Sequence, residues 1–163
     1  MRRFFLAAAV VCFCAATVGA QTKVSGTAQC AKPEDQHAIA VGDLPDHSLV
    51  VEQAKCAWTK PMEIGGDKSK EGVSTATDDV SGSAFRTRGF HVSTMESGDK
   101  FFVWFQGSGT TKDGKLEGQK GNWGFTGGTG KLKGLKGKGT FSCTASGDAM
   151  TCEVEGEYEL AKK

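Results

Sequence analysis

The residues whose types and spacing most invite a chemical interpretation form a glycine- and lysine-rich run over residues 127–140. A phosphate-binding P-loop needs four residues between its first glycine and a Gly-Lys-Ser/Thr triplet. Here the triplet is Gly130-Lys131-Leu132, and Phe125 stands where the first glycine should be. A dinucleotide fingerprint fails as well, because it would require glycine at the position of Lys133. The run therefore predicts a glycine-rich bend between two strands.

The lysines of this run offer a second interpretation, since clustered lysines neutralise phosphates or sulfated sugars. They are Lys131, Lys133, Lys136 and Lys138. The strand pairing derived below sets the last two opposite glutamates, which favours a charge-paired strand face over a polyanion site. Aromatic residues do not interleave with the lysines, so the stacking that supports single-strand binding is missing and no nucleic-acid partner is expected. Polyanion binding through Lys131–Lys138 remains an alternative.

No arrangement of residues predicts a catalytic centre. The sequence has no G-x-S-x-G elbow. His91 lies between Phe90 and Val92 in a predicted strand, and Tyr158 lies on the apolar face of the last hairpin, so the two would act as an acid/base pair only if the barrel mouth brought them together. Asp78-Asp79 lies beside a turn and is interpreted as turn chemistry. No catalytic residue and no cofactor are assigned.

The cysteines predict disulfides and not a metal site. Cys12 and Cys14 lie in the apolar N-terminal segment, which leaves the even set of Cys30, Cys56, Cys143 and Cys152. An even number of cysteines in an exported chain is typical of disulfide pairing. Neither these cysteines nor the three histidines supply the closely spaced ligand pairs of a zinc site, so no metal is expected.

The first twenty residues have the three parts of a secretory signal peptide. Arg2 and Arg3 precede an apolar run from Phe4 to Ala16, and Val18-Gly19-Ala20 provides a cleavage site of small residues. The apolar run is too short to cross a bilayer as a helix, so no membrane span is expected in the mature chain. We therefore expect a signal peptide over residues 1–20, a single barrel domain over 21–163, and a secreted or periplasmic location. The charge balance, 20 Lys+Arg against 19 Asp+Glu, provides no general attraction for nucleic acid or membrane.

The rest of the chain reads as short strands joined by tight turns. Glycine is abundant, with 23 residues, proline is scarce, with 3, and apolar residues alternate with polar ones. Frequent glycine within strands suggests a curved sheet that closes on itself. The fold class predicted is all-β, a single antiparallel β-barrel of about eight strands with two disulfides. The predicted strands are Val24–Cys30, His37–Val41, His47–Trp58, Gly72–Val80, Ser83–Met95, Lys100–Thr111, Lys115–Thr126, Lys136–Ala145 and Ala149–Leu160.

The last hairpin is the best determined of these elements. If Gly147-Asp148 is a two-residue turn, Cys143 faces Cys152 within reach of a disulfide. The same register sets Lys138 opposite Glu157 on one face and makes the other face apolar throughout. The register therefore predicts the Cys143–Cys152 bridge, and elimination predicts Cys30–Cys56.

The preceding hairpin turns at Asp113-Gly114, a favoured type I′ pair. An uninterrupted ladder sets Trp104 opposite Trp123 and Phe102 opposite Phe125, with all four aromatics on one face. The opposite face carries a second apolar set, which comprises Phe101, Val103 and Phe105. Both sets cannot point into one barrel, so one of them is expected outside, as a homo-oligomer contact or a docking site. A bulge along so long a ladder would change this pairing.

Two parts of the chain resemble known families. The stretch Gly127–Gly134, followed by Lys138–Phe141, resembles the GG-x-G-x-F-x-G segment of plant allene oxide cyclases and dirigent proteins. The wider chain is similar to small exported bacterial proteins of unassigned function that share this barrel, on residues 41–43, 47–49, 71–74 and 121–123. The resemblance implies an eight-stranded antiparallel barrel, with a trimer as one form. It carries over no cyclase or dirigent active-site residue to a position in this chain.

These observations favour a non-enzymatic exported barrel that binds a small apolar or amphipathic molecule, or that serves as an envelope interaction module for a protein partner. The residues expected to form the ligand site or interface are Phe102, Trp104, Trp123, Phe125, Tyr158 and His91. The alternative is a cyclase- or dirigent-like enzyme that steers a reactive intermediate in its cavity, a label that rests on fold analogy alone.

Overall fold

The computed structural model of the chain describes residues 21–112, 115–147 and 149–161. The predicted signal peptide, residues 1–20, lies outside this part of the chain, as do Asp113 and Gly114 of one predicted turn and Asp148 of the other. Within the described ranges there is no helix long and apolar enough to cross a membrane.

The described residues form ten strands and one short 3-10 turn. The elements are β1 (Thr22–Cys30), β2 (Asp35–Ala40), β3 (His47–Lys60), β4 (Glu63–Ile64), β5 (Asp67–Ser81), β6 (Ala84–Met95), β7 (Lys100–Lys112), β8 (Lys115–Gly128), η1 (Gly130–Leu132), β9 (Lys136–Ser146) and β10 (Ala149–Glu159). The nine predicted strands correspond to the nine long ones. The two elements that the sequence did not predict, β4 and η1, are each only two or three residues long.

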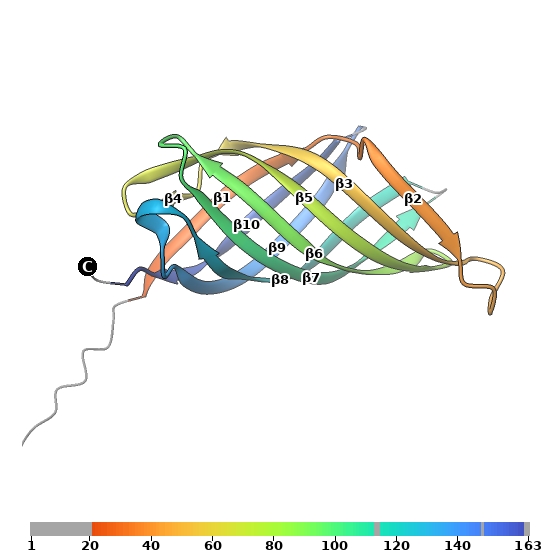
Figure 1. Cartoon of the computed structure of the whole chain (residues 1–163). Helices are drawn as coiled ribbons and strands as arrows, with labels where there is room; N and C mark the ends of the chain where they lie inside the picture. The colour runs from red at the N-terminus through yellow and green to blue at the C-terminus, as the bar shows by residue number, and fades with distance from the viewer. Residues whose placement is uncertain (1–20, 113–114, 148, 162–163) are drawn as a thin grey trace, which may run out of the picture.

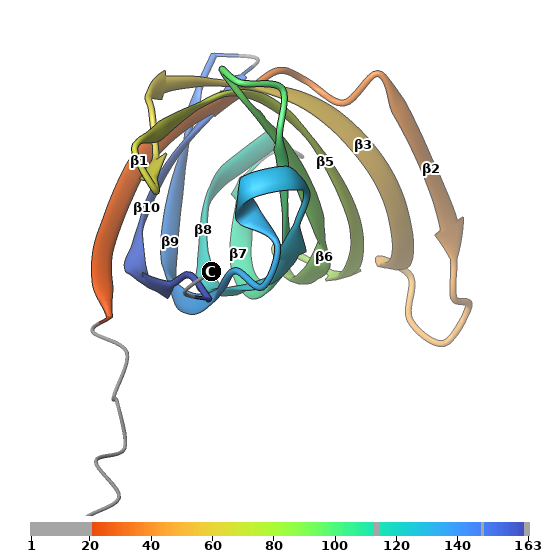
Figure 2. The ribbon, with the colours of Figure 1, turned by 60° about the vertical axis from the view of Figure 1, so that its left-hand side comes forward.

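The strands close into an eight-stranded antiparallel barrel (Figure 1). The strand order runs β3-β1-β10-β9-β8-β7-β6-β5, and the pairing of β3 with β5 closes the ring. Strand β2 pairs with residues 48–53 of β3, on the edge that pairs with β1 further along, and lies outside the ring, as Figure 2 shows. The all-β barrel predicted from the alternation and the glycine content is thus confirmed.

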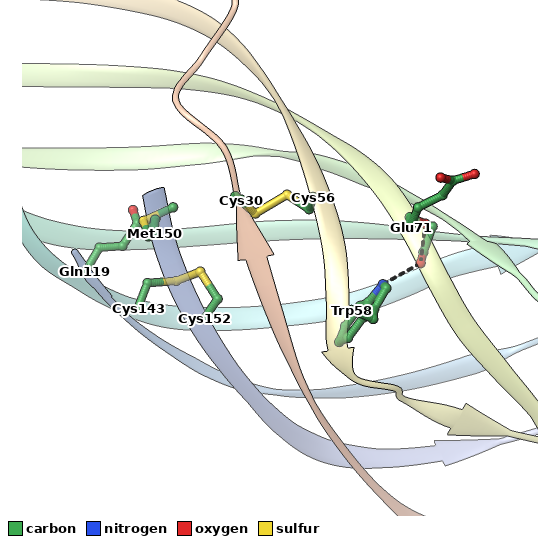
Figure 3. Close-up of a disulfide and its surroundings, with 9 residues drawn as sticks. Cys30, Cys56, Trp58, Glu71, Gln119, Cys143, Met150 and Cys152 are labelled. Carbon is green, nitrogen blue, oxygen red and sulfur yellow. Dashed lines mark hydrogen bonds between the residues drawn. A yellow bond between two sulfur atoms is a disulfide. The ribbon is translucent and has the colours of Figure 1, made fainter. Parts of the chain in front are cut away.

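Both predicted disulfides are present (Figure 3). Cys143 and Cys152 face each other in a β9–β10 ladder that keeps one register from Lys136↔Glu159 to Ser146↔Ala149. Cys30 and Cys56 face each other across β1 and β3, where only the four pairs from Thr27↔Lys60 to Cys30↔Cys56 join the two strands. The Cys30–Cys56 bridge therefore joins the two neighbouring strands that share the shortest ladder in the ring.

The predicted register of the β7–β8 hairpin is wrong over most of its length. It holds at Thr111↔Leu116, next to the turn, but the ladder shifts by one residue beyond that pair and again between Phe102 and Val103. Each shift is a β-bulge on β8, and one extra residue moves every later side chain to the other face of the sheet.

As a result, the four aromatics predicted to share one face are divided between two. Trp123 and Phe125 belong to the buried core with Phe101 and Val103, whereas Trp104 pairs with Gly124 on the outside. Phe102 likewise lies outside, beside the exposed Val92 of β6. Neither predicted set lies outside as a whole: Phe101, Val103 and Phe105 face the interior, and of the first set only Phe102 and Trp104 lie outside.

Inside the barrel, aromatic rings lie over glycines of neighbouring strands. A Cβ atom at Gly26 would lie 2.7 Å from the Trp58 ring, and one at Gly89 would lie 2.7 Å from the ring of Phe105. The same relation joins Phe85 to Gly109, Phe141 to Gly107, and Trp123 to both Gly139 and Gly156. Because a barrel of eight strands has a narrow interior, a ring on one strand needs a neighbour without a side chain.

The η1 turn lies across one end of the barrel (Figure 2). Leu132 and Leu135 from this segment are buried, and they join a core cluster that includes Ile64, Met95 and Phe101. This end of the interior is therefore filled by side chains.

We predict that Gly26→Ala lowers the free energy of unfolding by about 1–3 kcal/mol, the usual cost of overpacking a core. The added methyl would displace the Trp58 ring, whose Nε1 atom donates a hydrogen bond to Ser93 Oγ at 2.8 Å. Denaturant unfolding measures the change, with Ser25→Ala on the exposed face of the same strand as a near-neutral control. If Gly26→Ala unfolds at the wild-type midpoint, the ring does not lie over this glycine.

Candidate functional site

A small apolar cavity of about 110 Å³ lies inside the barrel. Its walls come from strands on all sides of the ring, and both disulfides contribute to them through Cys30, Cys143 and Cys152. The larger apolar residues that line it are Trp58, Met62, Phe101, Val103, Phe105, Trp123, Phe141, Met150 and Val154. The cavity thus occupies the space that the rings and their facing glycines leave unfilled.

Three polar residues, Ser74, His91 and Gln119, also line the cavity. The side-chain amide of Gln119 donates to Met150 Sδ at 3.3 Å, and a thioether is a weak acceptor. Gln119 and Met150 lie beside the Cys143–Cys152 bridge in Figure 3. A bound molecule with a carbonyl or hydroxyl group would offer this amide a stronger acceptor.

His91 is held as a neutral ring. Its imidazole packs edge-on against Trp58, with 6.2 Å between ring centroids, and its Nε2 atom is buried over Gly72 without a hydrogen-bond partner. Burial lowers the pKa of His91 to about 4, because removing the ring from water disfavours its charged form. At neutral pH the cavity therefore carries no charge from this residue.

Tyr158 does not meet His91. Its hydroxyl oxygen accepts a hydrogen bond from the backbone N–H of Gly65 at 3.1 Å, in the turn between β4 and β5. Tyr158 packs against the core but does not line the cavity, whereas His91 does. The structure thus gives no support to an acid/base pair formed by these two residues.

The aromatic candidates from the sequence fall into two places. Trp123 lines the cavity, and the Phe125 ring packs against the Trp123 ring, with 4.9 Å between their centroids. Phe102 and Trp104 lie on the outer face next to β6, where Phe90 is 64% exposed. A homo-oligomer contact at this outer face stays a prediction.

Two carboxylates that point toward the barrel interior form a feature that sequence analysis missed. Asp78 lies within β5 and not in a turn, which corrects the earlier interpretation of Asp78-Asp79. Glu52 lies on β3 diagonally opposite, since Val50 pairs with Asp78 and Glu52 pairs with Ala76. The signal was available in the alternation, because Asp78 and Glu52 share the strand faces of the buried Ala76 and Val50.

The surroundings raise the pKa of both carboxyl groups. For Glu52 burial is the main cause and the nearby Asp78 charge adds to it, while a hydrogen bond from Gln36 at 3.2 Å opposes the shift. For Asp78 burial again dominates, and a hydrogen bond from Thr87 opposes it. One oxygen of Asp78 is buried without a partner. Ionisation of this pair therefore opposes folding.

A second polar group lies at the loop between β2 and β3. The two ring nitrogens of His47 contact Asp43 at 2.6 Å and Asp79 at 2.9 Å. These hydrogen bonds raise the pKa of His47, and the bond to His47 lowers the pKa of Asp43. Even so, no group of three potential ligands in the described ranges is arranged to hold a metal ion.

The glycine- and lysine-rich run forms the predicted bend. The Asp99 carboxylate accepts a hydrogen bond from the backbone N–H of Lys131 at 2.9 Å, so this N–H already has an anionic partner. Lys136 and Lys138 pair with Glu159 and Glu157, as predicted. The loop is thus organised around a carboxylate of the chain itself.

The comparisons with known proteins concern the barrel as a whole. No family model and no curated protein matches the chain. Among solved structures, it is similar to a conserved protein of unknown function from Rhodopseudomonas palustris, with a TM-score of 0.49, 9% identity, and coverage of 85% of this chain and 98% of that one. A DUF3224-family protein of unknown function from Shewanella oneidensis gives 0.49 and 18%, with coverage of 88% and 100%.

The pterocarpan synthase dirigent protein gives a TM-score of 0.49 at 11% identity, with coverage of 95% of this chain and 100% of that one. Two of the three kinds of protein named by the sequence resemblance, bacterial proteins of unknown function and dirigent proteins, are among the structures to which the chain is similar. No residue role is carried over from any of them.

We predict that Glu52→Gln and Asp78→Asn each raise the melting temperature at pH 7. Because the pKa of each carboxyl group is raised in the folded protein, the folded state binds more protons, and stability falls as pH rises above the ordinary values of 4.5 and 3.8. The gain over the wild type should grow from pH 4 to pH 7 and vanish near pH 3. Glu153→Gln, which removes an exposed carboxylate, serves as the control. Melting curves across this range would contradict the assignment if either variant were less stable than the wild type at pH 7.

Proposed function

We propose that this protein is a small exported barrel that binds a compact apolar molecule in its interior cavity. The observation that carries the proposal is the cavity of about 110 Å³ between the aromatic rings, lined by apolar side chains with three polar residues among them. Apolar walls with a few placed polar groups are the usual composition of small-molecule sites.

The size of the cavity limits the ligand. An engineered cavity of about 150 Å³ lined by apolar side chains stays dry and binds benzene, while drug-sized ligands occupy roughly 300–1,000 Å³. The cavity here therefore suits a single ring or a short branched chain.

The chemistry of the walls indicates a ligand without charge. His91 is neutral at physiological pH, and the other two polar residues of the wall, Ser74 and Gln119, carry no charge. A buried ion would lose its hydration without gaining a charged partner. A neutral molecule with one acceptor for the Gln119 amide fits these walls best.

The two disulfides suggest an oxidising, extracytoplasmic environment. The residues that read as a signal peptide support export to the periplasm or the medium. We accordingly propose that the protein meets its ligand outside the cytoplasm.

The proposal is tested by thermal unfolding with benzene, cyclohexanol and indole as probes. A probe that binds the folded state alone should stabilise the wild type by about 1.4 kcal/mol at ten times its Kd. Ala28→Leu places a larger side chain in the cavity wall and should abolish the shift, whereas Ala57→Leu, on the exposed face of β3, should leave it unchanged. Val154→Phe provides a second filling variant in case Ala28→Leu unfolds.

Two results would contradict the proposal. One is that none of the three probes shifts the wild-type transition. The other is that a folded filling variant responds to the probes as strongly as the wild type does.

A further inference from the structure

The outer face of the barrel carries a groove of about 820 Å³ that is separate from the interior cavity. It crosses five neighbouring strands in the order β7-β8-β9-β10-β1. Its outward side chains are Trp104, Asn122, Lys138, Thr140, Glu155, Glu157, Lys23 and Ser25. A groove of this volume is as large as a typical small-molecule site.

The strand registers align these side chains in two rows across the sheet. One row runs through Asn122, Thr140, Glu155 and Ser25, which are directly paired from strand to strand. The second row runs through Trp104, Gly124, Lys138, Glu157 and Lys23 by the same pairings. Since neighbouring strands lie about 4.8 Å apart, the first row, with three intervals, extends roughly 14 Å, and the second, with four, roughly 19 Å.

Trp104 forms an aromatic platform at one end of the groove. Its partner on β8 is Gly124, and a Cβ atom there would lie 2.6 Å from the indole Nε1 and 3.0 Å from Cζ2. The indole therefore lies across β8 against the glycine backbone, toward Lys138 in the same row. The ring is partly exposed and contributes to the groove wall.

The charges of the groove balance. Lys23 and Lys138 oppose Glu155 and Glu157, so the surface favours neither a polyanion nor a polycation. In the described part of the chain, the ion pairs within 4.0 Å join other residues, namely Asp43, His47, Asp79, Glu34 and Lys55. The Gln21 amide approaches Glu157 at 3.2 Å, and the remaining donors and acceptors of the rows face solvent.

We propose that this groove binds a neutral oligosaccharide. A sugar ring has one face of C–H groups, which packs on the electron-rich face of an indole, and an edge of hydroxyls that both donate and accept. The groove provides the Trp104 indole for the C–H face. Its hydroxyl, amide, carboxylate and ammonium groups provide donors and acceptors for the sugar hydroxyls. Its length of roughly 19 Å suits three or four sugar units.

Addition of a peptide strand from a partner is excluded over most of the groove. Along the two rows, β7, β8, β9 and β10 are each paired with a strand on either side, so their backbone groups are occupied. On β1, residues 22–26 pair with β10 alone, because the ladder to β3 covers only Thr27–Cys30, and this edge borders the groove at one end. Across the groove itself, side chains must recognise the ligand, which agrees with an occupant that carries many hydroxyls.

The test is isothermal titration of the full mature protein with cellotetraose, maltotetraose and chitotetraose. At least one should bind, and Trp104→Ala should weaken that binding tenfold or more, with Trp104→Phe intermediate. Asn122→Ala should also weaken it. Leu49→Ala, which removes an exposed apolar side chain from β3 outside the groove, is the control and should bind as the wild type does. Because the site is neutral, affinity should change little between 50 and 500 mM NaCl.

Three outcomes would overturn the proposal. The first is that none of the three tetrasaccharides binds at millimolar concentration. The second is that one binds but Trp104→Ala and Asn122→Ala leave its affinity unchanged. The third is that the protein binds heparin through these residues, with an affinity that falls steeply as salt rises, which would indicate a polyanion site.

Discussion

Rings on one strand of the barrel lie over glycines on the next, and the size of the interior follows from this fit. Trp123 covers both Gly139 and Gly156, and Phe105 covers Gly89. Each glycine leaves space for one ring without widening the barrel, so a chain with 23 glycines can hold a largely aromatic core. The space left between the rings is the apolar cavity, whose size depends directly on these contacts.

The second constraint is the bulge on β8 opposite Thr110 and Thr111. Without it Trp104 and Trp123 would lie on the same face, and either the cavity would lose a wall or the outer groove would lose its platform. With it, one strand pair places Trp123 inside and Trp104 outside. Both proposed binding surfaces, one for a compact apolar molecule and one for a sugar chain, therefore rest on the same local irregularity.

Sequence predicted the fold well and the sites only in part. The β9–β10 register was predictable because the Cys143–Cys152 bridge, the Lys138–Glu157 pair and the apolar face all required the same pairing. The β7–β8 register had no such check, and a bulge leaves no clear pattern in a strand with apolar residues on both faces. The inward Asp78 was misread because its sequence neighbours suggest a turn. The groove was not predictable, since it requires the register of five strands at once.

The placement of the three tryptophans is tested most directly by hydrogen exchange of their indole N–H groups, followed by NMR. Trp58 Nε1 donates to Ser93 Oγ at 2.8 Å and Trp123 Nε1 donates to the Thr140 carbonyl at 3.0 Å, both within the barrel wall. We expect these two indoles to exchange slowly and the outer Trp104 to exchange quickly. Slow exchange of Trp104, or fast exchange of Trp123, would contradict the bulged register and with it the division between inner cavity and outer groove.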